Sequence, residues 1–239
     1  MKFIHFKNVD STSTFLKRNY SKYKNFTFVS TDFQTSGHGR MGRVWSSNNK
    51  ENLLFSLLIK DQKLIENYAS LSLASACAIY NALSKIKIKN VSIKWPNDVF
   101  VNNKKICGIL LESISNENKI DVLIIGIGLN VNQRTFENDL IHSPTSIYNE
   151  LNKKVSLFKI KYIVYKEIIK MLRKIKEGDK SYLSIIKENN YLLNKEVFAE
   201  INNEKKLVKV IDVNDDNTLK VCIDDKIINI SSGEISFHL

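Results

Sequence analysis

The chain has 239 residues, of which 43% are hydrophobic and 26% charged, as in a globular protein of one domain or one domain with a small appendage. No apolar run approaches the roughly 18 residues that cross a bilayer, and the segment before residue 8 is too short and interrupted for a signal peptide. Three scattered cysteines and four dispersed histidines disfavour a disulfide framework or a metal site, so we expect a cytoplasmic protein.

The net charge of +11 is unevenly distributed along the chain. Residues 1–190 hold 30 basic and 16 acidic side chains, a balance of +14, whereas the remainder holds six lysines and nine acids. A basic face can bind a nucleic acid, a nucleotide or an acidic protein. Most of these lysines are nevertheless expected on solvated surfaces, because lysine, isoleucine and asparagine are abundant together, as AT-rich coding produces.

The first half of the chain predicts one capped helix, two strands and a longer helix. Asp10–Thr14 has the polar side chains that start a helix. β-Branched and aromatic residues predict strands around 26–33 and 52–60. Leu64–Leu83 carries apolar residues at helical spacing, which predicts a buried helix.

The second half predicts a meander, two helices and then a second unit. Four strands joined by tight turns are expected at 91–95, 99–101, 105–112 and 122–127. Helices are expected at about 157–176 and 179–189, and short strands typical of a small β-barrel at 197–201, 207–213, 219–223 and 226–230. The fold class is therefore α+β, with a mixed, largely antiparallel sheet flanked by helices in residues 1–189 and a β-barrel in 190–239.

The segment Gln34–Trp45 concentrates glycines, arginines and a tryptophan. It holds three of the eight glycines, two arginines and one of two tryptophans, and this composition suits an anionic ligand. Its G-x-G-x-x-G pattern also matches the dinucleotide fingerprint, which requires a helix directly afterwards and an acid about 20 residues on. The following residues lack a helical period and lead into a strand, so we reject a Rossmann site.

Two further clusters follow predicted strands. Lys94–Asp98 places a lysine, a tryptophan and an Asn-Asp pair around one of two prolines, and Lys105 follows across a short turn. By itself this segment is equally a strand-ending turn. Gly126–Asn132 follows an apolar strand, where glycines mark either a bulge or a ligand lying on bare backbone, with Asn130 as its hydrogen-bonding partner.

Together these clusters resemble the catalytic domain of the biotin protein ligases. The family's ordered motifs are matched at Asp10–Ser13, Gly37–Arg43, Lys94–Asp98, Lys104–Ile109, Gly126–Asn130 and Gly233–Ser236. Two positions depart from the family pattern, because His38 replaces an arginine and Ser13 an asparagine. The first motif begins at residue 10, so the resemblance implies a monofunctional form without the N-terminal DNA-binding domain of many relatives.

The resemblance implies a fold like that of class II aminoacyl-tRNA synthetases, with an SH3-like C-terminal barrel. It also implies that biotin and ATP are substrates, with Mg²⁺ carried on the nucleotide. Biotin is activated as biotinyl-5′-AMP and then transferred to a lysine of a biotin carboxyl carrier protein, such as that of acetyl-CoA carboxylase. No DNA and no membrane are expected as partners, and a homodimer is possible.

Matched positions imply three overlapping sets of site residues and no metal ligand. The catalytic set is Arg40, Lys94, Asp98 and Lys105. The biotin set is Ser11, Thr12, Ser13, Gln34, His38, Gly39, Arg40, Lys105, Gly126 and Gly128. The ATP set is Arg40, Arg43, Trp45, Asn97, Lys105 and Asn130. Asp98 is expected to accept or orient the proton of the incoming lysine, with a turn-capping role as the alternative.

Two other functions compete with this hypothesis. A lipoate or octanoate ligase shares the architecture and the adenylation chemistry, but lacks the Lys94–Asp98 motif and glycine loop in this form. A basic nucleic-acid-binding protein would explain the charge of residues 1–190. No helix-turn-helix signature and no basic run interleaved with aromatics supports it.

Overall fold

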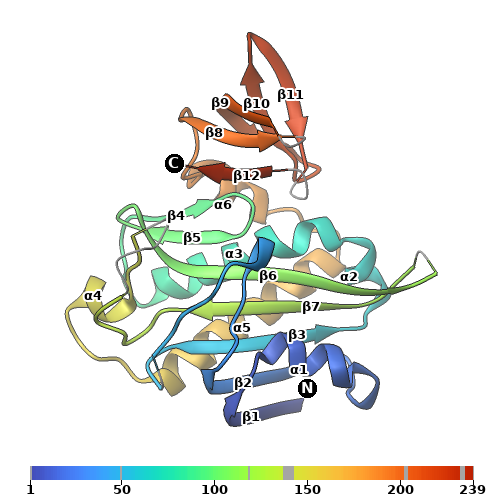
Figure 1. Cartoon of the computed structure of the whole chain (residues 1–239), viewed down its shortest axis with the longest axis vertical. Helices are drawn as coiled ribbons and strands as arrows, with labels where there is room; N and C mark the ends of the chain where they lie inside the picture. The colour runs from blue at the N-terminus through green and yellow to red at the C-terminus, as the bar shows by residue number, and fades with distance from the viewer. Residues whose placement is uncertain are drawn as a thin grey trace.

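The computed structural model describes residues 2–48, 50–117, 119–136, 143–201, 204–231 and 235–238. Two sheets organise the chain (Figure 1). The larger has seven strands in the order β1-β2-β3-β7-β6-β5-β4, and the smaller has five in the order β11-β10-β9-β8-β12. In the larger sheet only β1 and β2 pair in parallel. The predicted mixed, largely antiparallel sheet is confirmed.

The larger sheet is built from the first 129 residues. Its strands are β1 (Lys2–Val9), β2 (Thr27–Gln34), β3 (Leu53–Ile59), β4 (Val91–Lys94), β5 (Asp98–Val101), β6 (Lys104–Asn116) and β7 (Lys119–Leu129). The last four form the predicted antiparallel meander. Strand β1 was not predicted, although its side chains alternate in exposure as an edge strand requires.

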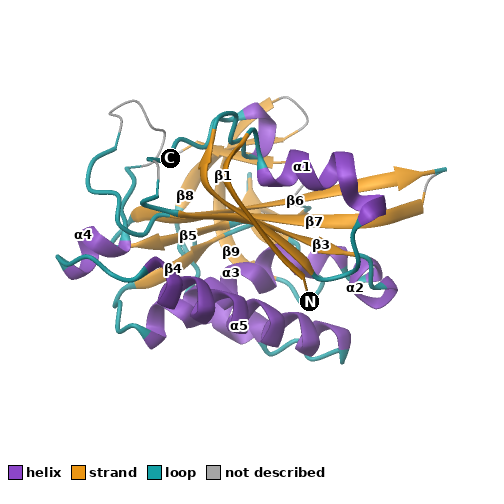
Figure 2. Cartoon of the chain, turned by 90° about the horizontal axis from the view of Figure 1, so that it is seen from below, coloured by secondary structure: helices purple, strands orange, loops and turns teal. Residues whose placement is uncertain are grey.

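Helices cover both faces of this sheet. They are α1 (Thr12–Asn19), α2 (Gln62–Glu66), α3 (Tyr68–Lys85), α4 (Ile147–Leu151), α5 (Leu157–Lys176) and α6 (Tyr182–Glu188), with short 3₁₀ turns η1 (Tyr20–Lys22) and η2 (Arg40–Gly42). Figure 2 shows α3 and α5 on one side of the sheet and α1 on the other. No helix among the described residues is long and apolar enough to cross a membrane.

The predicted helix Leu64–Leu83 is two helices. Asn67 separates α2 from α3, with φ −100° and ψ 25°. The Asn67 side-chain Nδ2 donates to the Lys63 backbone carbonyl at 2.8 Å, and the Asn67 backbone carbonyl accepts from Ser70 N at 2.9 Å. Asparagine breaks the helix here because its side chain competes for local backbone groups. Helix α4 was also not predicted, and its Ser146 cap was the available signal.

Along β7, the face beneath α1 changes from apolar side chains to glycines. Leu16 of α1 packs with Leu58, Val122 and Ile124 in a small core. Two and four residues beyond Ile124, the same face of β7 carries Gly126 and Gly128. Because side chains on one face of a strand recur every second residue, this glycine pair leaves a hollow beside the core.

The smaller sheet comprises β8 (Glu196–Ile201), β9 (Glu204–Val213), β10 (Leu219–Ile223), β11 (Lys226–Ile230) and β12 (Ile235–His238). All its pairs are antiparallel. This confirms a second small β unit, but β11 and β12 are its two edges, and no pairing among the described residues joins them. The sheet is compatible with the expected SH3-like unit, and its closure into a barrel stays a prediction. Gly233 and Glu234 of the last motif lie outside the described residues.

The predicted boundary at residues 189–190 lies against the larger sheet. Ile93 N donates to the Asn189 carbonyl at 2.8 Å, and Tyr191 N donates to the Ile93 carbonyl at 2.9 Å. The connection between the two sheets thus runs along β4. The connection also packs on β5, because the ring of Tyr191 stacks on that of Phe100 with the centroids 4.6 Å apart.

Candidate functional site

A cavity of about 630 Å³ opens on the α1 face of the larger sheet. Its walls come from the start of α1, the loop between β2 and β3, and strands β3, β6 and β7. Every residue that the sequence predicts for the site lines it: Ser11, Thr12, Ser13, Gln34, His38, Gly39, Arg40, Arg43, Trp45, Lys94, Asn97, Asp98, Lys105, Gly126, Gly128 and Asn130. The predicted set is therefore brought together in one place.

One end of the cavity is neutral and hydrogen-bonded within itself. The Gln34 Oε1 atom accepts from Thr12 N at 2.8 Å and from Thr12 Oγ1 at 3.1 Å. The Ser56 hydroxyl lies 2.7 Å from Thr12 Oγ1 and 2.8 Å from Ser13 Oγ. Ser11 caps α1 by accepting from Thr14 N, so the three hydroxyl residues are fixed at a helix start. This end is a preformed set of donors and acceptors for a neutral polar ligand.

The floor of the cavity is made of glycine. Gly108 of β6 and Gly128 of β7 are direct partners across the ladder, and Trp45 lies on both. A Cβ atom on Gly108 would lie 2.8 Å from Trp45 Cζ3, and one on Gly126 would lie 2.7 Å from Ser13 Oγ. Close approach of the indole and of α1 thus requires bare backbone at these positions.

The glycine-rich loop, which comprises the segment Gln34–Trp45, crosses the sheet in front of β3, β7 and β6, as the blue segment of Figure 1 shows. Trp45 N donates to the Gly37 carbonyl at 3.0 Å, which closes the loop on itself. Met41 and Gly42 both have left-handed backbone, with φ of 55° and 70°. The Gly39 N–H donates to the Arg43 carbonyl at 2.7 Å, so it is used within the loop.

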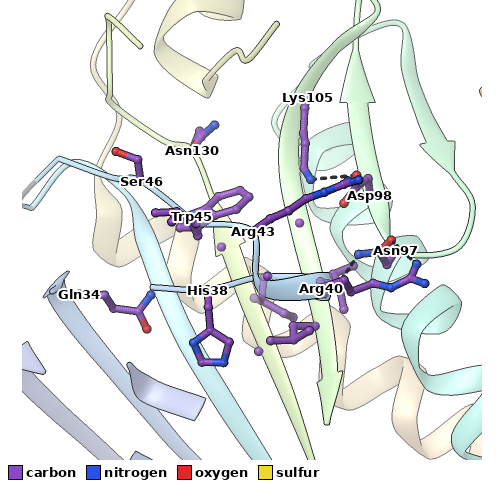
Figure 3. Close-up of a pocket in the computed structure, with 18 of the residues that line it drawn as sticks. Gln34, His38, Arg40, Arg43, Trp45, Ser46, Asn97, Asp98, Lys105 and Asn130 are labelled. Atoms are coloured by element: carbon purple, nitrogen blue, oxygen red, sulfur yellow. Dashed lines mark hydrogen bonds and ion pairs between the residues drawn. The ribbon is translucent and has the colours of Figure 1, made fainter. Parts of the chain in front are cut away.

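The other end of the cavity is cationic. Lys105 Nζ lies 2.8 Å from Asp98 Oδ2, and Figure 3 shows the Arg43 side chain extending towards the same carboxylate. Arg40 donates to Asn97 Oδ1 at 3.3 Å. With Lys94, which lines the same cavity, four cations stand near one carboxylate. Such an arrangement binds a polyanion.

Burial makes two of these cations poorly solvated. It lowers the pKa of Lys94 to about 8, although Asp98 acts in the opposite direction, and the nearby charges of Lys105 and Arg43 lower it further. Burial also lowers the pKa of Arg40 from its ordinary value, again against Asp98. Desolvated like charges in one cavity are costly, and an anionic ligand would relieve that cost.

Three polar atoms in the cavity are buried without a hydrogen-bond partner among the described residues. They are Trp45 Nε1, Asp98 Oδ1 and Asn130 Oδ1. The Asn130 side chain is nevertheless fixed, because its Nδ2 donates to the Thr145 carbonyl at 3.0 Å. Most buried polar atoms in folded proteins are paired. A ligand in the cavity can therefore supply the hydrogen-bond partners of these three atoms.

Three further residues contact the predicted site residues, and the sequence motifs gave none of them a role. Ser56 bridges Thr12 and Ser13, and its signal was that it is the one polar residue in the apolar strand Leu53–Ile59. Gly108 had been matched to a motif but given no role. Glu112 lies 3.5 Å from the His38 ring, a contact between distant segments that no local pattern indicates.

The donor set does not form a metal centre by itself. Within the described residues, no three His, Cys, Asp or Glu side chains lie together in a way that suits a metal ion. Asp98 is the carboxylate of the cavity, and one of its oxygens is paired with Lys105. A divalent cation would therefore need most of its ligands from a bound anion such as a polyphosphate.

Comparison with known proteins agrees with this geometry. A profile of the biotin/lipoate A/B protein ligase family matches residues 5–130. The bifunctional ligase/repressor BirA of Bacillus subtilis is 36% identical over 131 residues, which cover 54% of this chain and 40% of that protein. The biotin–[acetyl-CoA-carboxylase] ligase of Paracoccus denitrificans is 37% identical over 100 residues, 41% of each chain. The matched segment thus spans less than half of each of these two relatives.

Solved structures match over nearly the whole chain. The biotin protein ligase from Aquifex aeolicus in complex with biotin and ATP has a TM-score of 0.88 and 32% sequence identity, covering 99% of this chain and 98% of that one. The apo structure of the same Aquifex protein has a TM-score of 0.83. The likeness therefore includes both sheets and the region around the cavity.

Proposed function

Because the chain belongs to the biotin/lipoate A/B protein ligase family, we propose that it is an ATP-dependent biotin protein ligase. It activates biotin as biotinyl-5′-AMP and transfers the biotinyl group to a lysine of a biotin carboxyl carrier protein. The observation that carries the proposal is the cavity itself. A neutral hydrogen-bonding end and a cationic end are joined by a bare glycine floor, as a ligand with a neutral ring, a carboxylate and a nucleotide requires.

The neutral end is assigned to biotin. Ser11, Thr12, Ser13 and Gln34 supply donors and acceptors for the ureido ring, with Ser56 holding the two central hydroxyls in place. Gly126 and Gly128 let the ligand lie against the strand. The carboxylate then points to the backbone of His38, Gly39 and Arg40 and to Lys105. Ser13 remains a hydroxyl where the family usually has an amide, and its bond to Ser56 gives it a fixed position.

The cationic end is assigned to ATP. Trp45 provides an aromatic surface for the base, and Asn97 and Asn130 provide polar partners around it. Arg40, Arg43, Lys94 and Lys105 face the phosphates and reduce the repulsion between the biotin carboxylate and the triphosphate. Mg²⁺ enters with the nucleotide, and it adds charge neutralisation at the phosphate oxygens.

The reaction proceeds in two balanced steps. A biotin carboxylate oxygen attacks the α-phosphorus of ATP, the bond to the bridging oxygen breaks, and pyrophosphate leaves. The ε-amine of the carrier lysine then attacks the acyl carbon, the bond to the phosphate oxygen breaks, and AMP leaves. Asp98 is placed to accept or orient the proton that the amine loses, because its Oδ1 atom is buried without a partner among the described residues.

The test is exchange of labelled pyrophosphate into ATP with biotin, lipoate or no acid. The proposed ligase supports exchange with biotin only, and it then labels a purified biotin carboxyl carrier domain at its lysine. Exchange with lipoate alone would instead identify the lipoate branch, which the family profile also covers. Exchange with neither acid, from protein shown to be folded, would contradict the proposal.

The carrier is the biotin domain of acetyl-CoA carboxylase, and the enzyme works in the cytoplasm without DNA. Residues 1–189 form the catalytic domain and 190–239 a second domain that supports it. A contact in favour of this proposal is the hydrogen bond from Trp95 Nε1 to the Asn217 carbonyl at 3.0 Å. Light scattering of the purified protein tests the homodimer.

A further inference from the structure

Glu112 joins three separate parts of the chain beside the cavity. It lies on β6, two residues beyond Leu110 of the cavity wall and therefore on the same face of the strand. Its Oε1 atom is 2.6 Å from Lys17 Nζ of α1 and 3.5 Å from His38 Nε2 of the glycine-rich loop. One carboxylate thus links the sheet, the helix that carries the predicted biotin residues, and the loop above them.

The second oxygen of Glu112 is buried and has no partner among the described residues. A buried carboxylate oxygen without a hydrogen bond reduces stability. An apolar side chain at this position would avoid that cost. The carboxylate is therefore better explained by the cations it attracts than by its contribution to folding.

The His38 ring faces an acceptor on each side. Its Nε2 faces Glu112, and its Nδ1 is 3.5 Å from the Ser36 carbonyl oxygen. The ring is therefore held between the β6 carboxylate and the backbone of its own loop. The charged groups in contact are Glu112 of β6 and, through its shared oxygen, Lys17 of α1. Arg40 of the same loop points to Asn97 instead, as Figure 3 shows.

We propose that Glu112 is a positioning residue, which anchors the glycine-rich loop over the cavity through the His38 ring. It rests on the proposed function only in its consequence, that the anchored loop holds the biotinyl carboxylate and the adenylate. The anchor explains how histidine serves at this position. The ring stands where the family pattern has a guanidinium, and its Nε2 atom faces a fixed carboxylate on β6.

The first test needs no substrate, because the loop contains trypsin sites at Arg40 and Arg43. In ligand-free protein, E112Q and H38A are each expected to raise the rate of cleavage at these sites about fivefold, as loss of one partly buried ion pair implies. The double variant is expected to be no faster than either single one. Asp121→Asn is the control, since it removes an exposed carboxylate from the neighbouring strand β7 and should leave cleavage unchanged.

A second measurement separates anchoring from a general structural role. H38R keeps a cationic side chain that can face Glu112 and should be cleaved about as slowly as wild type. H38R combined with E112Q loses that contact and should be cleaved about as fast as E112Q alone.

Two results would overturn the inference. One is additive effects of E112Q and H38A, which would show that the residues act independently. The other is cleavage of H38R as fast as that of H38A. Because digestion reports loop attachment without biotin or ATP, either result leaves the proposed ligase activity standing. Equally, absent pyrophosphate exchange would leave the anchor standing.

Discussion

The two ends of the cavity differ in how far they are completed by the protein itself. At the neutral end, Ser56 bonds to Thr12 and Ser13, and Thr12 also bonds to Gln34. At the cationic end, four cations surround Asp98, and polar atoms of Trp45, Asp98 and Asn130 are buried without partners in the described part of the chain. The polar groups of the neutral end are thus satisfied by the protein itself, whereas the charges of the cationic end would be balanced by an anionic ligand.

This difference separates stability from function. Hydroxyl groups that satisfy one another stabilise the fold and prepare a binding surface together. Crowded, desolvated cations destabilise the fold, but they strengthen the attraction for a polyphosphate. Changes at the neutral end should therefore affect stability and biotin binding together, while changes at the cationic end should mainly affect catalysis.

The largest effect is expected from Lys105→Met. Removing this ammonium takes away a cation at the site of charge development and should lower the rate of biotin-dependent exchange about 10²–10³-fold. Lys104→Met is the matched control, because Lys104 is exposed on the same strand and outside the cavity. Circular dichroism checks that both variants are folded. A fall below tenfold for K105M would contradict the assignment.

Alanine at two of the floor glycines, Gly128 and Gly126, should weaken the binding of ATP and of biotin separately. G128A displaces the Trp45 indole, and loss of an aromatic surface for a base should raise the KM for ATP about tenfold. G126A pushes on Ser13 Oγ instead and should raise the KM for biotin. Steady-state kinetics with each substrate varied in turn measures both. Equal effects of either variant on the two KM values would remove the distinction between the ends.

The pH dependence of Lys94 should move activity and stability in opposite directions. Its pKa is lowered to about 8 by burial, so kcat/KM for ATP in the free enzyme should fall several-fold above about pH 8 as the cation is lost. The unfolded chain keeps the proton to higher pH, so the unfolding free energy of wild type relative to K94M should rise from about pH 8 to 10.5. In K94R the alkaline loss of activity should disappear.

The smallest effect is expected from Ser56→Ala. This change removes one partner from the Thr12 and Ser13 hydroxyls and should lower the free energy of unfolding by about 1 kcal/mol. The KM for biotin should rise a few-fold and that for ATP should not change. Urea unfolding and kinetics test both. A change in the KM for ATP alone would show that the hydroxyl network does not serve the neutral end.

Local patterns were sufficient for most of the elements, whereas the residues around the cavity followed from the resemblance to the biotin protein ligases. The strands of the meander and the start of α1 follow from alternation and capping, which act within a few residues. The break at Asn67 was missed because helical periodicity continues across it, and β1 because a short edge strand becomes evident only through its partner β2.

The sequence by itself determined the fold class, the rejection of a dinucleotide fold and the glycine and lysine motifs that suggested a ligase. Tertiary structure alone decided which of these motifs meet. Strand register places Lys94 opposite Asp98, Asp98 opposite Gly108, and Gly108 opposite Gly128, in one row across four strands. It also sets Ser56 opposite Gly126, and the path of the loop between β2 and β3 brings His38 to Glu112. Such neighbours depend on pairing between distant segments, which spacing along one segment does not specify.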